Sequence, residues 1–163
     1  MPYAYTIVES PVGKLKLVSS DAGLAAILWQ DDDPARVPLG AMIEDDGHPV
    51  LRETARQLVA YFAGTLRRFS VPLDFRGTHF QKRVWAALLA IPFGETRSYG
   101  AIARAIGRPG ASRAVGAANG RNPISIIAPC HRVIGANGAL TGFAGGLAAK
   151  QRLLEMEREA YVT

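Results

Sequence analysis

The chain has 163 residues, the length of one domain or of two small packed lobes. Hydrophobic residues make up 48% of it and charged residues 20%, so a disordered, collagenous or coiled-coil chain is excluded. No apolar run approaches the roughly 20 residues that a membrane span needs, and residues 1–5 do not resemble a signal peptide. We therefore expect a cytoplasmic protein that does not enter a membrane.

Charge is divided unevenly along the chain. Residues 1–75 carry a net charge of −3 and residues 76–163 a net charge of +8, and no acidic residue occurs between Thr96 and Leu154. Arginine outnumbers lysine 15 to 4, and the guanidinium group suits bidentate contact with phosphate. The charge of the second half therefore favours a polyanionic partner, and nucleic acid is the leading candidate. The alternative is a solvated basic surface in a protein from an arginine-rich proteome.

The chain begins with a pattern that is typical of short antiparallel strands. Three strands are predicted, at residues 3–9, 14–19 and 23–29. The first two are separated by the turn signal of residues 10–13. The acidic stretch that follows, residues 31–47, is rich in helix breakers and predicts a surface loop with room for a short helix.

A helix and a connecting segment complete the first half. Helical spacing of apolar residues predicts a helix over residues 50–63 that Gly64 ends. Residues 69–75 predict an edge strand or an extended linker. We therefore expect a boundary near Arg76, with a small N-terminal α/β lobe over residues 1–75 and a second lobe over residues 76–163.

The second half predicts helices. Thr78 and Gln81 form a capping-box pattern at the start of a helix that ends before Pro92. Ser98 is expected to cap a short helix over residues 99–106, which Gly107 ends, and Ser112 a second helix over residues 113–119. Two short helices joined by a turn that contains glycine outline a helix-turn-helix, although a helical hairpin in a core would look similar.

The second of these short helices has two different sides. Its inward side is expected to consist of Ala114, Val115 and Ala118. Arg113 and two small residues, Gly116 and Ala117, would leave a face that can approach a DNA backbone closely.

One cysteine, Cys130, excludes an internal disulfide. An apolar stretch carries it next to His131, between Pro129 and Arg132. A nearby imidazole and guanidinium would lower the pKa of the thiol and favour the nucleophilic thiolate. In a regular strand His131 would point to the opposite face, so contact with the sulfur needs a bend or a bridging water. The alternative is an inert buried thiol beside a core histidine.

Other kinds of site are less well supported. The histidines His48, His79 and His131 are scattered and have no ligand spacing, so we expect no metal and no cofactor. The glycines at 142, 145 and 146 flank Phe143 and Ala144, a pattern suited to exposing backbone N–H groups to a flat ligand.

Residues 80–157 resemble the O6-alkylguanine-DNA alkyltransferases, also called methylated-DNA–protein-cysteine methyltransferases. The matching motifs lie at residues 91–96, 98–100, 112–116, 119–123, 129–135 and 141–147, and the Pro-Cys-His-Arg core of residues 129–132 is the most specific of them. The first 75 residues are similar in layout to the family's variable N-terminal lobe. The fold class implied is α+β, with an antiparallel sheet in the first lobe and a winged-helix-like helix-turn-helix in the second.

The resemblance implies a single-turnover DNA repair enzyme. It would bind duplex DNA as a monomer that can cluster along the strand, flip out an O6-alkylguanine or an O4-alkylthymine, and accept the alkyl group irreversibly on Cys130. Non-transferase relatives that only bind alkylated guanine lack the cysteine that this chain has. A plain transcription regulator that uses the same helix-turn-helix is the second hypothesis.

The resemblance also implies residue roles. His131 would act as a water-mediated base for Cys130, Glu157 would orient His131, and Tyr99 would flip the base and donate a proton to it. Arg113 would fill the space left by the flipped base, and Asn122 would tie the recognition helix to the active-site turn. The residues implied in DNA contact are Ser98, Tyr99, Arg113, Ala114, Asn119 and Arg121.

The same resemblance places the guanine pocket. Its implied residues are Val133, Phe143, Ala144 and Gly145, with backbone groups of Cys130, Val133 and Ala144 reading the base. The chain departs from the family at two of them, because Phe143 stands where tyrosine is general and Ala144 where some members have serine. We expect these two differences to change how the protein recognises guanines with bulky alkyl groups.

Overall fold

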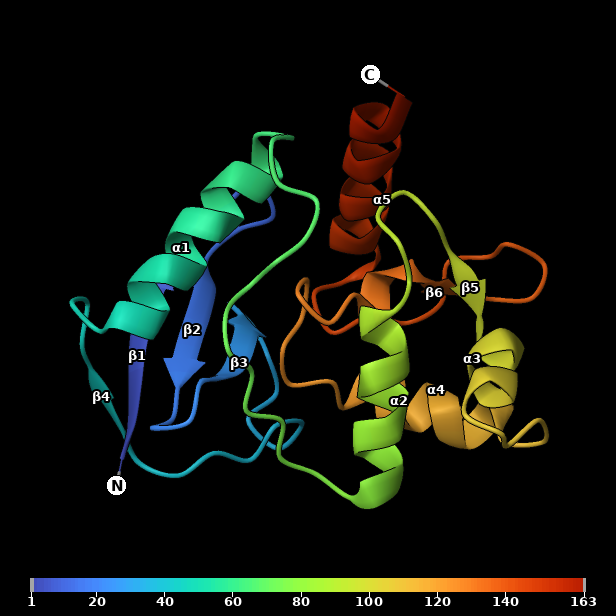
Figure 1. Cartoon of the computed structure of the whole chain (residues 1–163), viewed down its shortest axis with the longest axis horizontal. Coiled ribbons are helices and arrows are strands. Elements are labelled where there is room, and N and C mark those ends of the chain that lie inside the picture. The colour runs from blue at the N-terminus through green and yellow to red at the C-terminus, as the bar shows by residue number, and fades with distance from the viewer. Residues whose placement is uncertain (1, 163) are drawn as a thin grey trace.

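The computed structural model describes residues 2–162, which form a sheet-containing half and a helical half (Figure 1). The first half starts with the strands β1 (Tyr3–Val8), β2 (Leu15–Ser19) and β3 (Leu24–Trp29). They pair antiparallel in chain order, with β2 between β1 and β3. The predicted strands are confirmed, and their bounds differ from the prediction by one residue.

A fourth strand was not predicted. Strand β4 (Met42–Glu44) pairs with β1 in the parallel direction, so the sheet order is β3-β2-β1-β4. The expectation of a loop over residues 31–47, with room for a helix, is therefore wrong at these three residues. A three-residue strand is too short to show an alternating pattern, and its partner lies about forty residues earlier in the chain.

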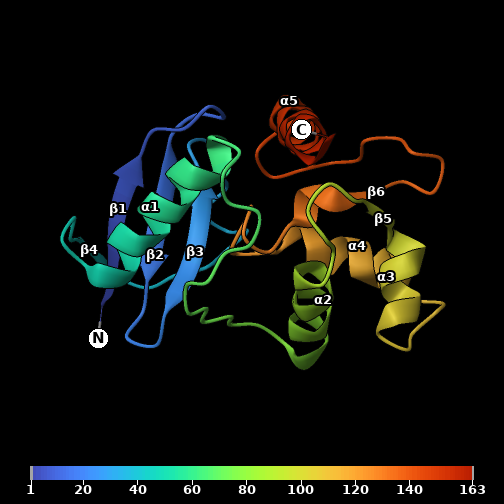
Figure 2. The ribbon, with the colours of Figure 1, turned by 45° about the horizontal axis from the view of Figure 1, so that its top comes forward.

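Helix α1 (Pro49–Phe62) lies across the sheet (Figure 2). Its buried side chains include Leu51, Leu58 and Tyr61. The helix ends where predicted, because Gly64 adopts a φ of 82°, a left-handed conformation that costs glycine little.

The outer edge of β3 is covered by two segments from later in the chain. Leu24 exchanges backbone hydrogen bonds with Pro72 and Asp74, both at 2.8 Å, so part of the segment 69–75 pairs with β3 as an edge strand would. Further along the same edge, Ile27 N donates to Pro123 O at 2.9 Å. The chain that leads to Cys130 is therefore fastened to the N-terminal sheet.

This second segment also enters the N-terminal core. The side chains of Ile124, Ile126 and Ile127 pack in one cluster with residues of the sheet and of α1. Ile126 has a φ of 76°, and it is the only non-glycine residue among residues 2–162 with a positive φ.

The helical half contains the predicted helix-turn-helix. Helix α2 (His79–Leu89) has the expected capping box, in which Gln81 N donates to Thr78 Oγ1 at 3.1 Å and Thr78 N to Gln81 Oε1 at 2.9 Å. Helix α3 (Tyr99–Ala105) is capped by Ser98, whose Oγ accepts from Ala101 N at 3.1 Å.

Helix α4 (Ser112–Gly120) starts differently from the prediction. The cap position is Ala111, and no side chain makes a capping hydrogen bond there, so the predicted capping by Ser112 is wrong. Ser112 is itself the first helical residue. The helix packs through Val115 and Ala118, and the buried Trp85 of α2 donates from Nε1 to Ala118 O at 2.9 Å.

The last elements surround Cys130. A short 3-10 helix, η1 (Cys130–Arg132), leads into β6 (Val133–Ile134), which pairs in parallel with β5 (Arg97–Ser98). Helix α5 (Leu147–Val162) then packs beside η1. The fold is α+β with a helix-turn-helix, as expected. Within residues 2–162 no helix combines the length and the apolar character of a membrane span.

Candidate active site and DNA-binding surface

Cys130 is the first residue of η1 and only 4% of its surface is exposed. The backbone therefore turns at this point instead of continuing as a strand, which is the bend that contact between neighbouring side chains requires. The side chains of Asn122 and Ser125 lie beside the sulfur and favour its charged form. Both come from the segment that is fastened to β3.

The thiol is uncharged in the resting protein. Burial raises the pKa of Cys130, and the hydrogen bond from Asn122 and the charges of Arg36 and Lys150 offset this only in part. The expectation that His131 and Arg132 would lower this pKa is wrong for the resting state, because both side chains turn to Glu157 instead.

His131 is fully buried. Its Nε2 lies 2.7 Å from Glu157 Oε2. An ionised carboxylate can only accept, so Nε2 carries the hydrogen and Nδ1 keeps its lone pair. Burial lowers the pKa of His131, although Glu157 opposes this effect, so the ring is neutral. Nδ1 has no hydrogen-bond partner among the described residues, and it is therefore available to receive a proton.

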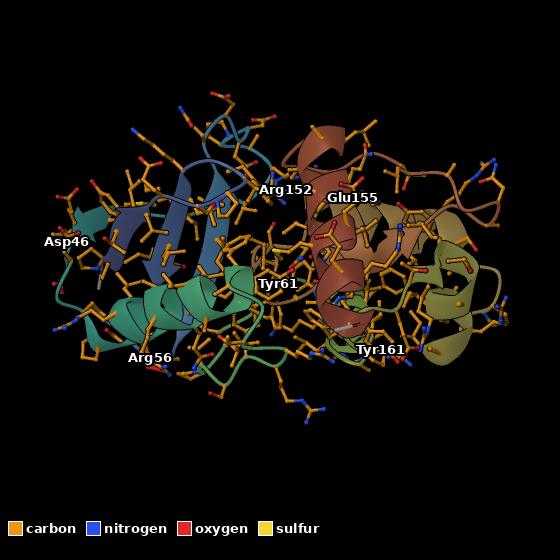
Figure 3. The ribbon with its side chains drawn as sticks, turned by 90° about the horizontal axis from the view of Figure 1, so that it is seen from above. Asp46, Arg56, Tyr61, Arg152, Glu155 and Tyr161 are labelled. Atoms are coloured by element: carbon orange, nitrogen blue, oxygen red, sulfur yellow. The ribbon has the colours of Figure 1, made fainter. Side chains whose placement is uncertain are left out.

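Glu157 is the carboxylate on which this cluster converges. Burial alone would raise its pKa, but His131 and Arg132 lower it to about 2. Arg132 donates from Nε to Oε1 at 2.9 Å and from Nη2 to Oε2 at 3.0 Å. Tyr61 of α1 donates its hydroxyl hydrogen to Oε2 at 2.5 Å. Figure 3 shows Tyr61 between α1 and α5, so the cluster joins the two halves.

Helix periodicity separates Glu157 from its acidic neighbours. Lys150, Leu153 and Glu157 share the buried face of α5, whereas Glu155 and Glu159 are exposed. Spacings of three and four residues return to the same face of a helix, and spacings of two do not. The site therefore has one buried carboxylate with two exposed ones beside it in the sequence.

Asn122 lies where the resemblance places a hinge, directly after the residue that ends α4. Its Nδ2 donates to Ala128 O at 2.8 Å, and its Oδ1 accepts from Ile124 N at 3.1 Å. The side chain is completely buried. These bonds connect the end of α4 to the turn that carries Cys130.

The predicted pocket residues come from β6 and from the loop that leads to α5. Val133 is buried, and its carbonyl accepts from Lys150 Nζ at 2.6 Å. Phe143 is half-buried and meets the ring of Trp29 edge-on, with centroids 5.3 Å apart. Ala144 is exposed, and Gly145 lies against the same tryptophan. A residue of β3 therefore supports the loop that carries Phe143, Ala144 and Gly145.

Tyr99 connects the helix-turn-helix to that loop. Its ring lies against Gly116 of α4, with Cδ1 at 3.7 Å from the point where a Cβ would stand. Its hydroxyl makes a short hydrogen bond with Thr141 Oγ1. The phenol is therefore held at the junction of α3, α4 and the pocket loop.

The exposed side of α4 differs from the one expected. Arg113, Ala114 and Ala117 are exposed, so the expectation that Ala114 packs inward is wrong, and Val115 and Ala118 fill that side. Asn119 is buried, with 6% of its surface exposed, so its side chain is not available for contact with DNA on this surface.

Two further residues of the expected DNA-binding set have partners within the protein. Arg121 is exposed, but its Nη1 donates to Ala35 O at 3.1 Å, a contact with the loop after β3. Ser98 is occupied as the cap of α3. Within residues 2–162 no group of three or more histidine, cysteine or acidic side chains is arranged to hold a metal ion.

Several site residues were missed by sequence reasoning. They are Trp29, Arg36, Tyr61, Thr141 and Lys150. Three of them come from the first 75 residues, where the resemblance is one of layout. A buried tyrosine at the end of an amphipathic helix looks like ordinary core in a sequence, so no local signal marks such a residue.

Comparison with known proteins identifies both halves. Residues 3–75 match the family described as 6-O-methylguanine DNA methyltransferase, ribonuclease-like domain. Residues 79–159 match the family described as 6-O-methylguanine DNA methyltransferase, DNA binding domain.

Individual relatives agree with these matches. The chain is 53% identical over 156 residues to the "Methylated-DNA--protein-cysteine methyltransferase" of Mycobacterium tuberculosis H37Rv, which covers 94% of this chain and 92% of the relative. It is 52% identical over 153 residues to the protein of the same name from Methanosarcina acetivorans, with 94% and 97% covered. The crystal structure of Mycobacterium tuberculosis OGT in complex with DNA superposes with a TM-score of 0.88 at 51% identity and covers 96% of this chain and 94% of that one. The chain therefore belongs to the 6-O-methylguanine DNA methyltransferase family.

Proposed function

We propose that the protein repairs O6-alkylguanine in duplex DNA by moving the alkyl group to Cys130 in a single, irreversible turnover. The observation that carries this proposal is the chain's one cysteine beside a buried histidine whose Nδ1 is free and whose Nε2 is held by a buried carboxylate. The names of the relatives, and the DNA in the solved Mycobacterium tuberculosis complex, support it.

The transfer step needs two proton movements. The Cys130 proton passes to His131 Nδ1, directly or through a water, and Glu157 stabilises the imidazolium that results. The thiolate then attacks the alkyl carbon in line with O6, so a C–S bond forms while the C–O6 bond breaks. The electron pair of that bond moves into the purine ring, where N3 takes a proton from Tyr99. The products are S-alkylcysteine and guanine. The proton that His131 gains from Cys130 balances the proton that Tyr99 gives to N3.

DNA would be held by the helix-turn-helix. Arg113, which is exposed on α4, would occupy the gap left by a flipped base, and Tyr99, whose ring lies against Gly116, would push the base out and protonate it. Ser98, Ala114 and Arg121 would contribute secondary contacts. Asn119 is proposed to act by packing, given its burial.

The flipped guanine would be read in the pocket formed by Val133, Phe143, Ala144 and Gly145. O4-alkylthymine is proposed as a second substrate, because it presents the same alkyl–oxygen bond next to a ring nitrogen. We place the reaction in the cytoplasm and on a monomer. Residues 1–75 and 76–163 are proposed as two lobes that work as one unit, since the chain before Cys130 packs in the N-terminal core.

The test is a mass measurement after incubation with duplex DNA that contains one O6-methylguanine. We expect one methyl group per protein, located on Cys130 by peptide mapping. The control is Cys130→Ser, which we expect to gain no methyl group but to bind the alkylated duplex as the wild type does, since phosphate contacts do not use the sulfur. DNA binding by the wild type without any methyl transfer would contradict the proposal and would favour a regulator.

A further inference from the structure

Trp29, the last residue of β3, touches the proposed site at several points although it belongs to the other half of the molecule. Only 7% of its surface is exposed. Its indole Nε1 donates to Ser125 Oγ at 3.1 Å, and Ser125 lies beside the sulfur of Cys130 and favours its charged form. One end of the indole is therefore separated from the reacting sulfur by a single side chain.

The rest of the indole supports the pocket loop. The ring of Phe143 meets it edge-on at 5.3 Å and an interplanar angle of 70°. Gly145 lies so close that an added Cβ would stand 2.6 Å from the indole Cδ2, a distance that real Cβ atoms do not adopt. The backbone at residue 145 is therefore in direct contact with the face of the tryptophan.

These contacts define a boundary of the space next to the sulfur. Ser125 lies beside the sulfur, and Phe143 packs against the buried cluster that contains Cys130, so an alkyl group on the sulfur has to fit near both residues. Protein interiors are close-packed, so a larger group can enter only if one of these walls moves. Trp29 contacts both of them and is itself fixed in the sheet.

We propose that Trp29 determines how large an alkyl group the site accepts. This proposal rests on the proposed function and adds a specificity-determining residue from the N-terminal sheet to it. The indole fixes the positions of Phe143 and Gly145 relative to Cys130, and its bulk sets how far the walls can retreat. A smaller side chain at position 29 makes room for bulkier adducts.

The experiment compares single-turnover rates on two duplexes that differ only in carrying O6-methylguanine or O6-benzylguanine. For Trp29→Leu we expect the ratio of the benzyl rate to the methyl rate to rise about tenfold over the wild type, the discrimination typical of a change of pocket volume. For Trp29→Phe, which keeps most of the ring and is the safer variant for folding, we expect a smaller rise in the same direction.

A matched control separates pocket size from lost packing. Phe75→Leu removes an aromatic ring that stacks on Trp85 with ring centroids 5.4 Å apart, and it should leave the rate ratio unchanged. Equal ratios in the wild type, Trp29→Leu and Trp29→Phe would overturn the inference while leaving alkyl transfer intact. An absence of transfer from either duplex to the wild type would overturn the proposed function as well.

A double-mutant cycle provides the second measurement. Gly145→Ala should slow transfer from both duplexes, because its Cβ collides with the indole. Adding Trp29→Leu to Gly145→Ala should restore most of the lost rate, since the obstructing ring is gone. Additive losses in the double variant would count against direct contact between Trp29 and the pocket loop as the cause.

Discussion

Cys130 owes its reactivity to the groups that take its proton. Burial raises the pKa of the thiol, so the resting protein holds a protonated sulfur that is protected from random electrophiles. His131 Nδ1 is the base within the described residues that has no other partner, and Glu157 fixes the ring in the tautomer that this role needs. The Cys130 thiolate is therefore formed when His131 Nδ1 takes the proton of the thiol.

Replacing Glu157 by Gln should weaken this transfer of the Cys130 proton to His131. We expect Glu157→Gln to raise the apparent pKa of Cys130 further and to slow methyl transfer by about 10- to 1000-fold, the range of a general acid–base contribution. The pKa is measured by the pH dependence of iodoacetamide alkylation, and the rate by single-turnover reaction with methylated duplex.

The matched control for this variant is Glu155→Gln. Glu155 is two residues away on the exposed side of α5, where Gln151 Nε2 donates to it at 3.0 Å. It should change neither the pKa profile nor the rate. If the profile of Glu157→Gln matched that of Glu155→Gln, Glu157 would have no part in the chemistry.

Single residues also mark how far the sequence could predict the site. The resemblance named Cys130, His131, Glu157 and Asn122. His131 and Glu157 hydrogen-bond to each other, and Asn122 lies beside Cys130 and bonds to the turn that carries it. Tyr61 is separated from its partner Glu157 by 96 residues. A contact across the lobe boundary has no periodicity or spacing in the sequence, so it could be found only once the two halves were packed together.

Helix caps offer a direct comparison between a correct and an incorrect sequence prediction. Thr78 caps α2 through a reciprocal pair of hydrogen bonds, whereas Ser112 makes no capping bond at α4. Thr78 is predicted from a capping box with Gln81, whereas Ser112 is predicted from residue preference alone, which does not fix the first helical residue to within one position. The structure therefore confirms the cap that a second residue supported in the sequence, and not the cap that rested on one residue.

This difference should appear in stability. Thr78→Ala is expected to lower the free energy of unfolding by about 1 kcal/mol, the usual cost of a lost N-cap. Ser112→Ala, the matched variant, should change it by less than about 0.5 kcal/mol. Urea unfolding followed by circular dichroism measures both. Equal losses in the two variants would mean that the Thr78 cap is not formed in solution.

Helix α4 carries the residue proposed to replace a flipped base. Arg113→Ala should slow repair of duplex DNA far more than reaction with the free base O6-benzylguanine, because only the duplex requires extrusion of a base at a cost of a few kcal/mol. Competition assays with the two substrates measure the difference. Arg158→Ala, which removes an exposed positive charge from α5, controls for simple loss of charge. Equal slowing on both substrates would assign Arg113 to folding or chemistry.

The two lobes are joined by buried charge, and this makes the fold sensitive to acid. The pKa of Glu157 is about 2 in the folded protein against 4.5 for an ordinary glutamate. A lowered carboxyl pKa stabilises the folded state above the unfolded value, and this stability is lost as the pH falls from 4.5 towards 2. His131 acts in the same direction from a higher pH, because burial lowers its pKa and the unfolded chain takes up the proton first.

We therefore expect the wild type to lose stability steeply below pH 4.5. The part due to Glu157 is on the order of 3 kcal/mol at neutral pH. Glu157→Gln should be less stable at neutral pH and should show a flatter dependence between pH 5 and 3, about the interval over which an ordinary glutamate titrates. Urea midpoints across this interval test the difference, and parallel pH curves for the two proteins would show that Glu157 is not the group responsible.

Ile126 holds its left-handed backbone only because the N-terminal core encloses its side chain, 1% of which is exposed. Such a conformation in a β-branched residue costs on the order of 1 to 3 kcal/mol, and it relaxes when the surrounding packing loosens. The segment from Asn122 to Cys130 would then lose its alignment while most helices and strands persist. We therefore expect a preparation in dilute denaturant to keep a native circular dichroism spectrum while it loses reactive thiols. The usable fraction of this single-use reagent is better measured by titrating its active sites than by observing its fold.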